Sequence, residues 1–366
     1  MRPSASPSVP IVANMRVQSP IELASGVDAL YLSGHGRLSK GFLARLEEER
    51  IFADRASRPV PFELGELMHG LAPHGWGKYR FCLDHEFGRI GFSASRRLPS
   101  VRVQPRAEFL HSVGPEETVR HFERLLRPFV EGMVLSVARL DLFLDVEGMS
   151  LCAADRAAFV CRADDCMTYE TGNVVTGFSF GSRRTQRISA RLYDKTAEMT
   201  IKGTDWWEAV WGERHTPGVP VWRIEFEIGR AALSALELYR PDAVLAAAPS
   251  LWRYCTTDWL TLRRPRRDAN RSRWPLDPRW DTVQSATLAH GGTALDFIRQ
   301  HKRASSIHRL MPALIGYLVA FAIWAGTSDL PNTLEALSAS VENDEIVRRM
   351  TLAERIQRRR AERGDW

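Results

Sequence analysis

Alternation of polar and apolar residues constrains the fold of this chain most strongly, and it is clearest in residues 187–195. Successive side chains of a β-strand point to opposite faces, so this stretch predicts a strand with two different faces. One face is apolar and belongs in a core: Ile188, Ala190 and Leu192. The other face carries a hydroxyl, two cations and a phenol: Ser189, Arg191, Tyr193 and Lys195.

The phenol between two cations makes Tyr193 a candidate nucleophile, because nearby positive charge favours the phenolate. The alternative is a strand with one polar face and a tyrosine that reaches towards solvent. Networks of structural charges imitate functional sites, so this stretch alone does not decide between the two readings.

Two further stretches, residues 139–146 and 222–228, alternate in the same way. Apolar residues form one face of each stretch and charged residues the other, except that Phe143 lies on the charged face, where it either stacks on a base or fills space. If the three strands share a sheet, four carboxylates meet on the face of Tyr193: Asp141, Asp145, Glu225 and Glu227. Carboxylates in such number repel one another unless they hold a metal ion or pair with arginine, and hard oxygen ligands favour Mg²⁺ or Mn²⁺. Arg139 and Arg223 lie on the same face and are expected to pair with these carboxylates as structural ion pairs.

Taken in order, these stretches resemble the motifs of rolling-circle replication initiators of the plasmid Rep_trans type, a family related to relaxases of integrative conjugative elements. The matching pieces are Arg139-Leu-Asp141 with Asp145, the run 177–183 that leads to Arg191-Leu-Tyr193-Asp194-Lys195, and Trp222-Arg223-Ile-Glu225-Phe-Glu227. The resemblance covers roughly residues 27–262 and is clearest over 135–230. The related HUH endonucleases bind metal through a His-hydrophobe-His pair. In this chain no two histidines are separated by a single residue, so acidic ligands must serve instead.

The resemblance implies that Tyr193 nicks single-stranded DNA at an origin and rejoins it through a 5′-phosphotyrosine intermediate. It also implies that Asp141, Asp145 and Glu225 or Glu227 hold Mg²⁺ or Mn²⁺. Arg191 and Lys195 are then expected to stabilise phosphate charge or to lower the pKa of Tyr193. The element that carries the protein is a plasmid, a phage or an integrative element.

Three alternatives to a replication initiator remain open. The chain is a conjugative relaxase of the same family, or a DNA-binding replication protein without covalent chemistry. The third alternative is a metal-dependent nuclease whose nucleophile is water, with Tyr193 only positioning the DNA.

The order of predicted elements repeats along the chain, which indicates an α+β fold of two pseudo-duplicated β-α-β-β-β-α lobes. We expect two HUH-endonuclease-like antiparallel sheets followed by a helical C-terminal region. In the second lobe, a helix starts at Ala153. The expected domains are a disordered N-terminus (1–20), a non-catalytic lobe (21–133), a catalytic lobe (134–262), a basic linker rich in arginine and tryptophan (263–281) and a helical, basic region (282–366). The last helix of that region is expected over 341–363.

The net charge of +6 favours an anionic partner, and the basic residues concentrate late in the chain. Arginine contacts phosphate and tryptophan stacks on unpaired bases, so the linker, including Trp280, predicts contact with double- and single-stranded origin DNA. A solvated basic linker is the alternative. The residues assigned to DNA binding are Arg183, Arg184, Arg187, Arg263, Arg264, Arg266, Arg267 and Trp274.

Sequence features that are absent or weak restrict the possible functions further. The chain has no G-x-x-x-x-G-K-[ST] phosphate loop, so unwinding is assigned to a host helicase and synthesis to a host DNA polymerase. Five cysteines with irregular spacing predict free thiols in a reducing cytoplasm. The apolar stretch 310–324 is short for a membrane span and is expected to form a buried helix, so no membrane partner is predicted. A homodimer is compatible with this sequence.

Overall fold

The computed structural model describes residues 20–182, 185, 187–286, 288 and 314–363. The chain divides into two compact units, Met1–Leu295 and Asp296–Trp366, which are described separately. The predicted disorder of residues 1–20 lies almost entirely outside the described residues.

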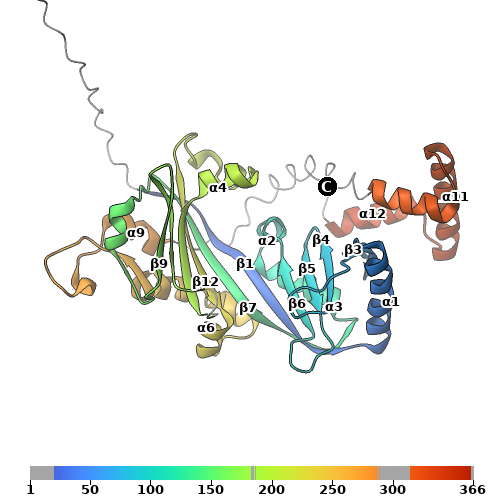
Figure 1. Ribbon diagram of the computed structural model, residues 1–366, viewed down its shortest axis with the longest axis horizontal. Helices are drawn as coiled ribbons and strands as arrows, with labels where there is room; N and C mark the ends of the chain where they lie inside the picture. Colours follow the sequence, from blue (N-terminus) through green and yellow to red (C-terminus); the bar gives the residue numbers. More distant parts are fainter. Residues whose placement is uncertain (1–19, 183–184, 186, 287, 289–313, 364–366) are drawn as a thin grey trace, which may run out of the picture. The chain divides into compact units, whose positions relative to one another are not determined.

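The first unit is built on one antiparallel sheet of eleven strands, in the order β2-β3-β4-β5-β6-β1-β7-β12-β11-β10-β9. Its centre is a long ribbon of two 18-residue strands, β1 (Ile21–Leu38) and β7 (Val130–Glu147). Figure 1 shows this ribbon passing diagonally between two groups of shorter strands. On the β1 side lie β2 (Val60–Leu64), β3 (Leu67–Leu71), β4 (Phe81–His85), β5 (Gly88–Phe92) and β6 (Val101–Pro105). On the β7 side lie β12 (Val221–Gly229), β11 (Ile188–Asp194), β10 (Val174–Phe180) and β9 (Cys166–Thr171).

The expectation of two separate sheets is wrong, because the first strands of the two halves pair with each other. The register of β1 with β7 runs from Ile21 opposite Glu147 to Leu38 opposite Val130, with four interruptions. The strand order is nevertheless the same in both halves. Outward from the centre, β1 is followed by β6, β5, β4 and β3, and β7 is followed by β12, β11, β10 and β9. This agreement supports the duplication, which stays a prediction.

The helices of the first half begin at residues that favour helix starts. Helix α1 (Lys40–Ala56) is capped by Ser39, whose hydroxyl accepts a hydrogen bond from the backbone N–H of Phe42 at 3.4 Å. After the short α2 (Ala107–Val113), α3 (Pro115–Leu126) has proline in its first turn with two glutamates beside it. These helices connect the strands of the first half and carry part of its core.

The second half departs from the predicted lobe pattern in two places. Instead of a helix from Ala153, a single 3₁₀ turn spans Ala153–Ala157, and the chain then enters the short strand β8 (Phe159–Cys161). Asp155 accepts a hydrogen bond from the N–H of Cys152 at 2.8 Å and so holds the turn closed. Between β11 and β12 the chain forms α4 (Lys195–Lys202), α5 (Trp206–Trp211) and a 3₁₀ turn, none of which was expected.

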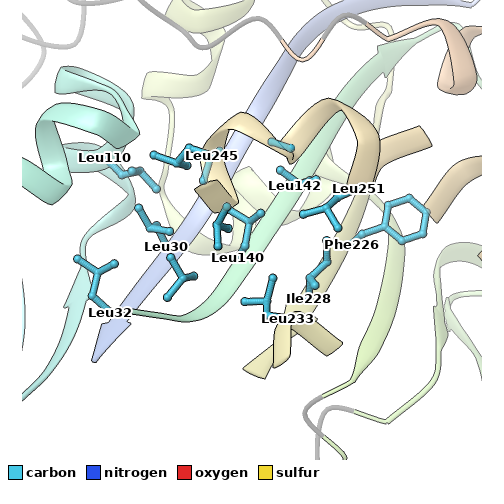
Figure 2. Packing of buried hydrophobic residues seen from close by; sticks show 14 of the residues in the cluster. Leu30, Leu32, Leu110, Leu140, Leu142, Phe226, Ile228, Leu233, Leu245 and Leu251 are labelled. Carbon is cyan, nitrogen blue, oxygen red and sulfur yellow. The ribbon is translucent and has the colours of Figure 1, made fainter. Parts of the chain in front are cut away.

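One face of the sheet packs against helices and forms the core (Figure 2). Helices α6 (Arg230–Ala235), α7 (Pro241–Ala246) and α8 (Ala248–Tyr254) follow β12 directly and cover this face. They contribute Leu233, Leu245 and Leu251, which pack with Leu140, Leu142, Phe226 and Ile228 of the sheet. The face of β11 that carries Tyr193 is therefore turned away from these helices.

Residues 263–281 fold back onto the first unit. The segment follows a π-helical turn (Cys255–Trp259) and β13 (Leu260–Leu262), which pairs with β8, and it contains a 3₁₀ turn (Arg271–Arg273) and the start of α9 (Pro278–Ser285). The expectation that Trp280 is available to stack on a base is wrong. Its ring is fully buried, and its Nε1 donates to the carbonyl of Thr256 at 2.9 Å.

The described part of the second unit is helical. It contains a helix over Leu314–Ala325, α11 (Leu330–Arg348) and α12 (Leu352–Arg363). The expected single helix over 341–363 is interrupted at Arg349, which adopts a left-handed backbone conformation with φ 51°. The helix over Leu314–Ala325 is not buried as expected, since Ile323 and Trp324 are 77% and 78% exposed.

No single described helix is long and apolar enough to cross a membrane. The pair Leu314–Ala325 and Leu330–Val347 passes such a test only when taken together, and it is bent by 84°.

The core face yields a stability prediction at Phe226, which is fully buried and meets the Trp252 ring edge-on at 5.4 Å. Phe226→Ala should lower the free energy of unfolding by about 3–5 kcal/mol, because it leaves a cavity between the sheet and α8. Urea denaturation followed by circular dichroism measures the change. Ile201→Ala, at a position 86% exposed, is the control and should leave the midpoint nearly unchanged.

Candidate functional site

The three alternating stretches lie side by side as β7, β12 and β11, so their polar side chains share one face. Across β12 and β7, Glu227 lies opposite Asp141 and Arg223 opposite Asp145. Across β11 and β12, Arg191 lies opposite Glu225 and Tyr193 opposite Arg223. Residues directly opposite in antiparallel strands have Cβ atoms about 4.5–5.5 Å apart, which brings the phenol, the acids and the cations within contact range.

Glu225 is the centre of the cluster around the phenol. The Tyr193 hydroxyl donates a hydrogen bond to Glu225 Oε2 at 3.2 Å, and the Arg191 guanidinium pairs with Oε1 of the same carboxylate. The Glu225 side chain is 1% exposed, whereas the Arg191 side chain is 40% exposed and reaches the surface. The phenol is therefore next to a buried proton acceptor and to a cation that is open to solvent.

The pKa of Tyr193 is raised well above its usual value, because the ring is buried and Glu225 adds negative charge beside it. The expectation that the neighbouring cations lower this pKa is wrong for this arrangement. Arg223 does oppose the shift, but burial and Glu225 outweigh it. An attacking phenol at this position therefore needs a group that removes its proton.

Lys195 is held close to Tyr193 by the start of α4. Asp194 ends β11 and caps the helix, since its carboxylate accepts from the N–H of Ala197 at 2.9 Å. The buried Lys195 Nζ lies 2.6 Å from Glu198 Oε2 and 5.9 Å from the centre of the Tyr193 ring. Burial and the charge of Arg223 lower the pKa of Lys195.

Asp141 and Glu227 form a second acidic group beside Glu225. The Arg139 guanidinium binds both oxygens of Asp141 and lies 2.9 Å from Glu227 Oε2. Burial raises the pKa of Asp141 to about 8; Glu225 and Glu227 add to the shift and Arg139 opposes it. The face therefore concentrates more negative charge around Asp141 than Arg139 neutralises.

Asp145 lies in a different environment from the other three acids. Its two oxygens accept from Arg223 Nε and Nη2, each at 2.7 Å, and Oδ2 also accepts from Trp211 Nε1 at 2.8 Å. Asp145 is fully buried, and Phe143 is buried next to it with its ring 4.3 Å from the Arg223 guanidinium. Phe143 thus fills space inside the protein and offers no surface to a base.

The four acids differ in how well their oxygens could bind a divalent metal ion. Within the part of the chain that the structure describes, no group of three His, Cys, Asp or Glu side chains is arranged to hold a metal. Asp145 does not fit, because Arg223 and Trp211 already enclose both of its oxygens. Asp141 and Glu227 have suitable oxygen donors, and a metal ion there would take the place of Arg139, which binds both oxygens of Asp141 and contacts Glu227.

Sequence reasoning missed four side chains that contact Arg223 or its carboxylate partners. Arg223 Nη1 donates to Asp28 Oδ1 at 2.7 Å, and the Trp207 ring lies 3.9 Å from its guanidinium. The other two are Trp211, which contacts Asp145, and His111 of α2, which lies 3.6 Å from Asp28. The W-W-x-x-x-W spacing of α5 was a signal in the sequence that could have marked Trp207 and Trp211. Asp28 was hidden because it lies in a bulge of β1, where simple alternation fails.

The residues assigned to DNA binding are scattered over the structure. Arg183 and Arg184 lie outside the described residues, and Arg187 is exposed just before β11. Arg264, Arg266 and Arg267 are exposed after β13. Arg263 Nη1 donates to the carbonyl of Trp274, whose own Nε1 donates to the carbonyl of Asp268, so these two stabilise their own loop.

Comparison with known proteins gives a likeness in structure but none in sequence. No family model matches the chain, and no curated protein sequence matches it. Among solved structures, a rolling circle replication initiator protein from Geobacillus stearothermophilus is similar, with 18% sequence identity and a TM-score of 0.42. The match covers 73% of this chain and 98% of that chain.

The buried Arg223 yields a second stability prediction. Arg223→Met should lower the free energy of unfolding by about 3–5 kcal/mol, because it leaves the buried Asp145 carboxylate without its counter-charge. Chemical denaturation measures the loss. The double variant Arg223→Met with Asp145→Leu should recover part of it, and a double variant as unstable as the single one would contradict the assignment.

The pKa of Asp141 yields a prediction on pH. Its carboxyl binds a proton more tightly in the folded chain, with a pKa of about 8, than at the ordinary value of 3.8. This group therefore makes stability fall as pH rises from about 4 to about 8, since the folded state must then hold a charge that it disfavours. Asp141→Asn should flatten that dependence in urea denaturation at several pH values. Asp54→Asn, at an exposed site on α1, should leave the slope unchanged.

Proposed function

We propose that the protein nicks single-stranded DNA at a replication origin and rejoins it through a covalent link to Tyr193. One observation carries the proposal: the Tyr193 hydroxyl donates a hydrogen bond to the buried Glu225 carboxylate, on a polar face that also bears Arg191 and Lys195. A nucleophile, a base in contact with it and cations for a phosphate are the parts that phosphoryl transfer requires.

The proposed step conserves the number of phosphodiester bonds. The phenolic oxygen of Tyr193 forms a bond to the scissile phosphorus while the bond to the 3′-oxygen breaks. Glu225 takes the phenolic proton, and the leaving 3′-oxygen takes a proton from solvent. The product is a 5′-phosphotyrosine and a free 3′-OH, and attack by a 3′-OH reverses the step and rejoins the strand.

The cations have distinct roles in this proposal. Arg191 is partly exposed and lies beside the phenol, so it can meet a phosphate oxygen and stabilise the charge that develops there. Lys195 is buried and paired with Glu198, so it positions the ring and contributes positive charge. Arg139 and Arg223 orient the carboxylates instead of meeting the phosphate.

A divalent ion fits this proposal at Asp141 and Glu227, once Glu225 is assigned to the phenol and Asp145 to Arg223. Mg²⁺ or Mn²⁺ bound there would supply charge stabilisation to the phosphate oxygens. Origin DNA, a host helicase and a host polymerase are the partners that a nicking initiator without its own ATP site would use.

The covalent step is tested at Tyr193. Tyr193→Phe should abolish the covalent adduct and leave DNA binding unchanged, because it removes only the attacking oxygen. The assay incubates the protein and Mn²⁺ with single-stranded oligonucleotides, labelled at their 3′ ends, that tile the DNA flanking the gene, and resolves adducts on denaturing gels. Tyr169→Phe, on the edge strand β9 and separated from β11 by β10, is the matched control and should retain the adduct.

Two other results would redirect the assignment. Nicking without an adduct would indicate water as the nucleophile, with Tyr193 only positioning DNA. Binding without nicking by the unmodified chain would indicate a replication protein that uses no covalent chemistry.

The role of Glu225 is tested separately. Glu225→Gln keeps the size of the side chain but cannot accept the phenolic proton as a carboxylate does, so nicking should slow by about 100-fold or more. Glu227→Gln should instead weaken the dependence on Mn²⁺ concentration. Equal rates for Glu225→Gln and the unmodified protein would remove Glu225 from the step.

A further inference from the structure

A tryptophan packs against the sheet in the half of the unit that lacks Tyr193. Trp76 and Tyr79, in the loop between β3 and β4, fold over Gly91 of β5. A Cβ atom at Gly91 would come within 3.0 Å of the Tyr79 side chain and 3.2 Å of the Trp76 ring, so only glycine leaves room for them. Arg102 of β6 lies directly opposite Gly91, and its guanidinium is 4.0 Å from the centre of the Trp76 ring.

A second ring continues this arrangement towards the candidate site. Tyr31 of β1 lies opposite Arg139 of β7, whose guanidinium is 4.8 Å from the centre of the Tyr31 ring. Arg102 lies opposite Ser33, two residues along β1 from Tyr31 and on the same face, so Tyr31 lies between the two arginines. Arg139 in turn holds Asp141 and Glu227, so the rings and cations extend without interruption to the acidic cluster.

The cation that contacts Trp76 most closely, Arg102, is not neutralised by the described part of the protein. Within the described residues, Arg102 forms no ion pair with a carboxylate. Arg89 also lies near Trp76, but it is paired with Asp84 at 3.4 Å.

We propose that this row binds the single strand that extends from the scissile phosphate. We call it the Trp76 track and define it as Trp76, Arg102, Tyr31 and Arg139. The half-buried rings of Trp76 and Tyr31 are platforms for unpaired bases, and Arg102 meets a phosphate. The inference rests on the proposed function for its endpoint, because the track leads to the cluster of Tyr193.

The geometry favours a single strand over a duplex. From β5 to β11 the face crosses five strand spacings of about 4.8 Å, and the register also advances along β7 from Ser136 to Asp145 at about 3.3 Å per residue, so Trp76 and the phenol are roughly 35–40 Å apart along the sheet. Bases stacked inside a duplex do not present their faces to a protein ring, whereas an unpaired strand does. The track would bind nucleotides that lie several positions along the strand from the scissile phosphate, and so position that phosphate at Tyr193.

Fluorescence anisotropy with labelled oligo(dT) tests the track on the full chain. Trp76→Ala should weaken binding by about 10-fold, the loss expected for one stacked base, and Trp76→Phe should restore most of it. Arg102→Gln should lower the slope of log K against log salt by about 0.7, the value for one lost phosphate contact to a single strand. Arg120→Gln, on the exposed surface of α3 and paired with Glu117, is the matched control and should change neither quantity.

The outcomes separate this inference from the proposed function. Unchanged oligo(dT) affinity in both Trp76→Ala and Arg102→Gln, with circular dichroism spectra like the unmodified chain, overturns the track even if Tyr193 forms its adduct. Weakened binding by these variants supports the track even if no adduct forms. Equal loss of affinity for duplex DNA in the same variants overturns the assignment to a single strand.

Discussion

The buried Arg223 guanidinium is the interaction on which the site depends. It lies between Asp145 of β7 and Asp28 of β1, and so ties β12 to both strands of the central ribbon. Aromatic rings of Phe143 and Trp207 enclose it, which excludes water from the ion pairs and makes their geometry strict. With that register fixed, Glu225 must face the phenol of the next strand.

The two faces of the sheet have different roles, which explains how one fold holds both a hydrophobic core and a charged cluster. The helices after β12 cover the apolar face, and the insertion between β11 and β12 places tryptophans over part of the polar one. The acids near Tyr193 consequently differ in environment. Asp145 is sealed under α5, whereas Arg191 beside Glu225 reaches solvent.

Alternation was sufficient to predict which side chains share a face, because a period of two is intrinsic to strands. It predicted that Tyr193, Arg191 and Glu225 meet. It did not predict the partner of each carboxylate, since Trp211 reaches Asp145 from a helix and Asp28 reaches Arg223 from a bulge of β1. The raised pKa of Tyr193 was missed for a related reason, because burial depends on tertiary packing that a local pattern of charges does not contain. The break between α11 and α12 depends on the backbone conformation of one residue, Arg349, and was likewise not visible in the sequence.

The long ribbon of β1 and β7 has a consequence for how such a chain can evolve. Each half of the sheet contributes one strand to the ribbon. Along one edge, each of these strands pairs with the strand from the other half. Separating the halves would expose an 18-residue edge on both pieces, and long open edges promote aggregation. Exchange of one half between related genes would therefore succeed only where the incoming strand keeps the same bulges as the one that it replaces.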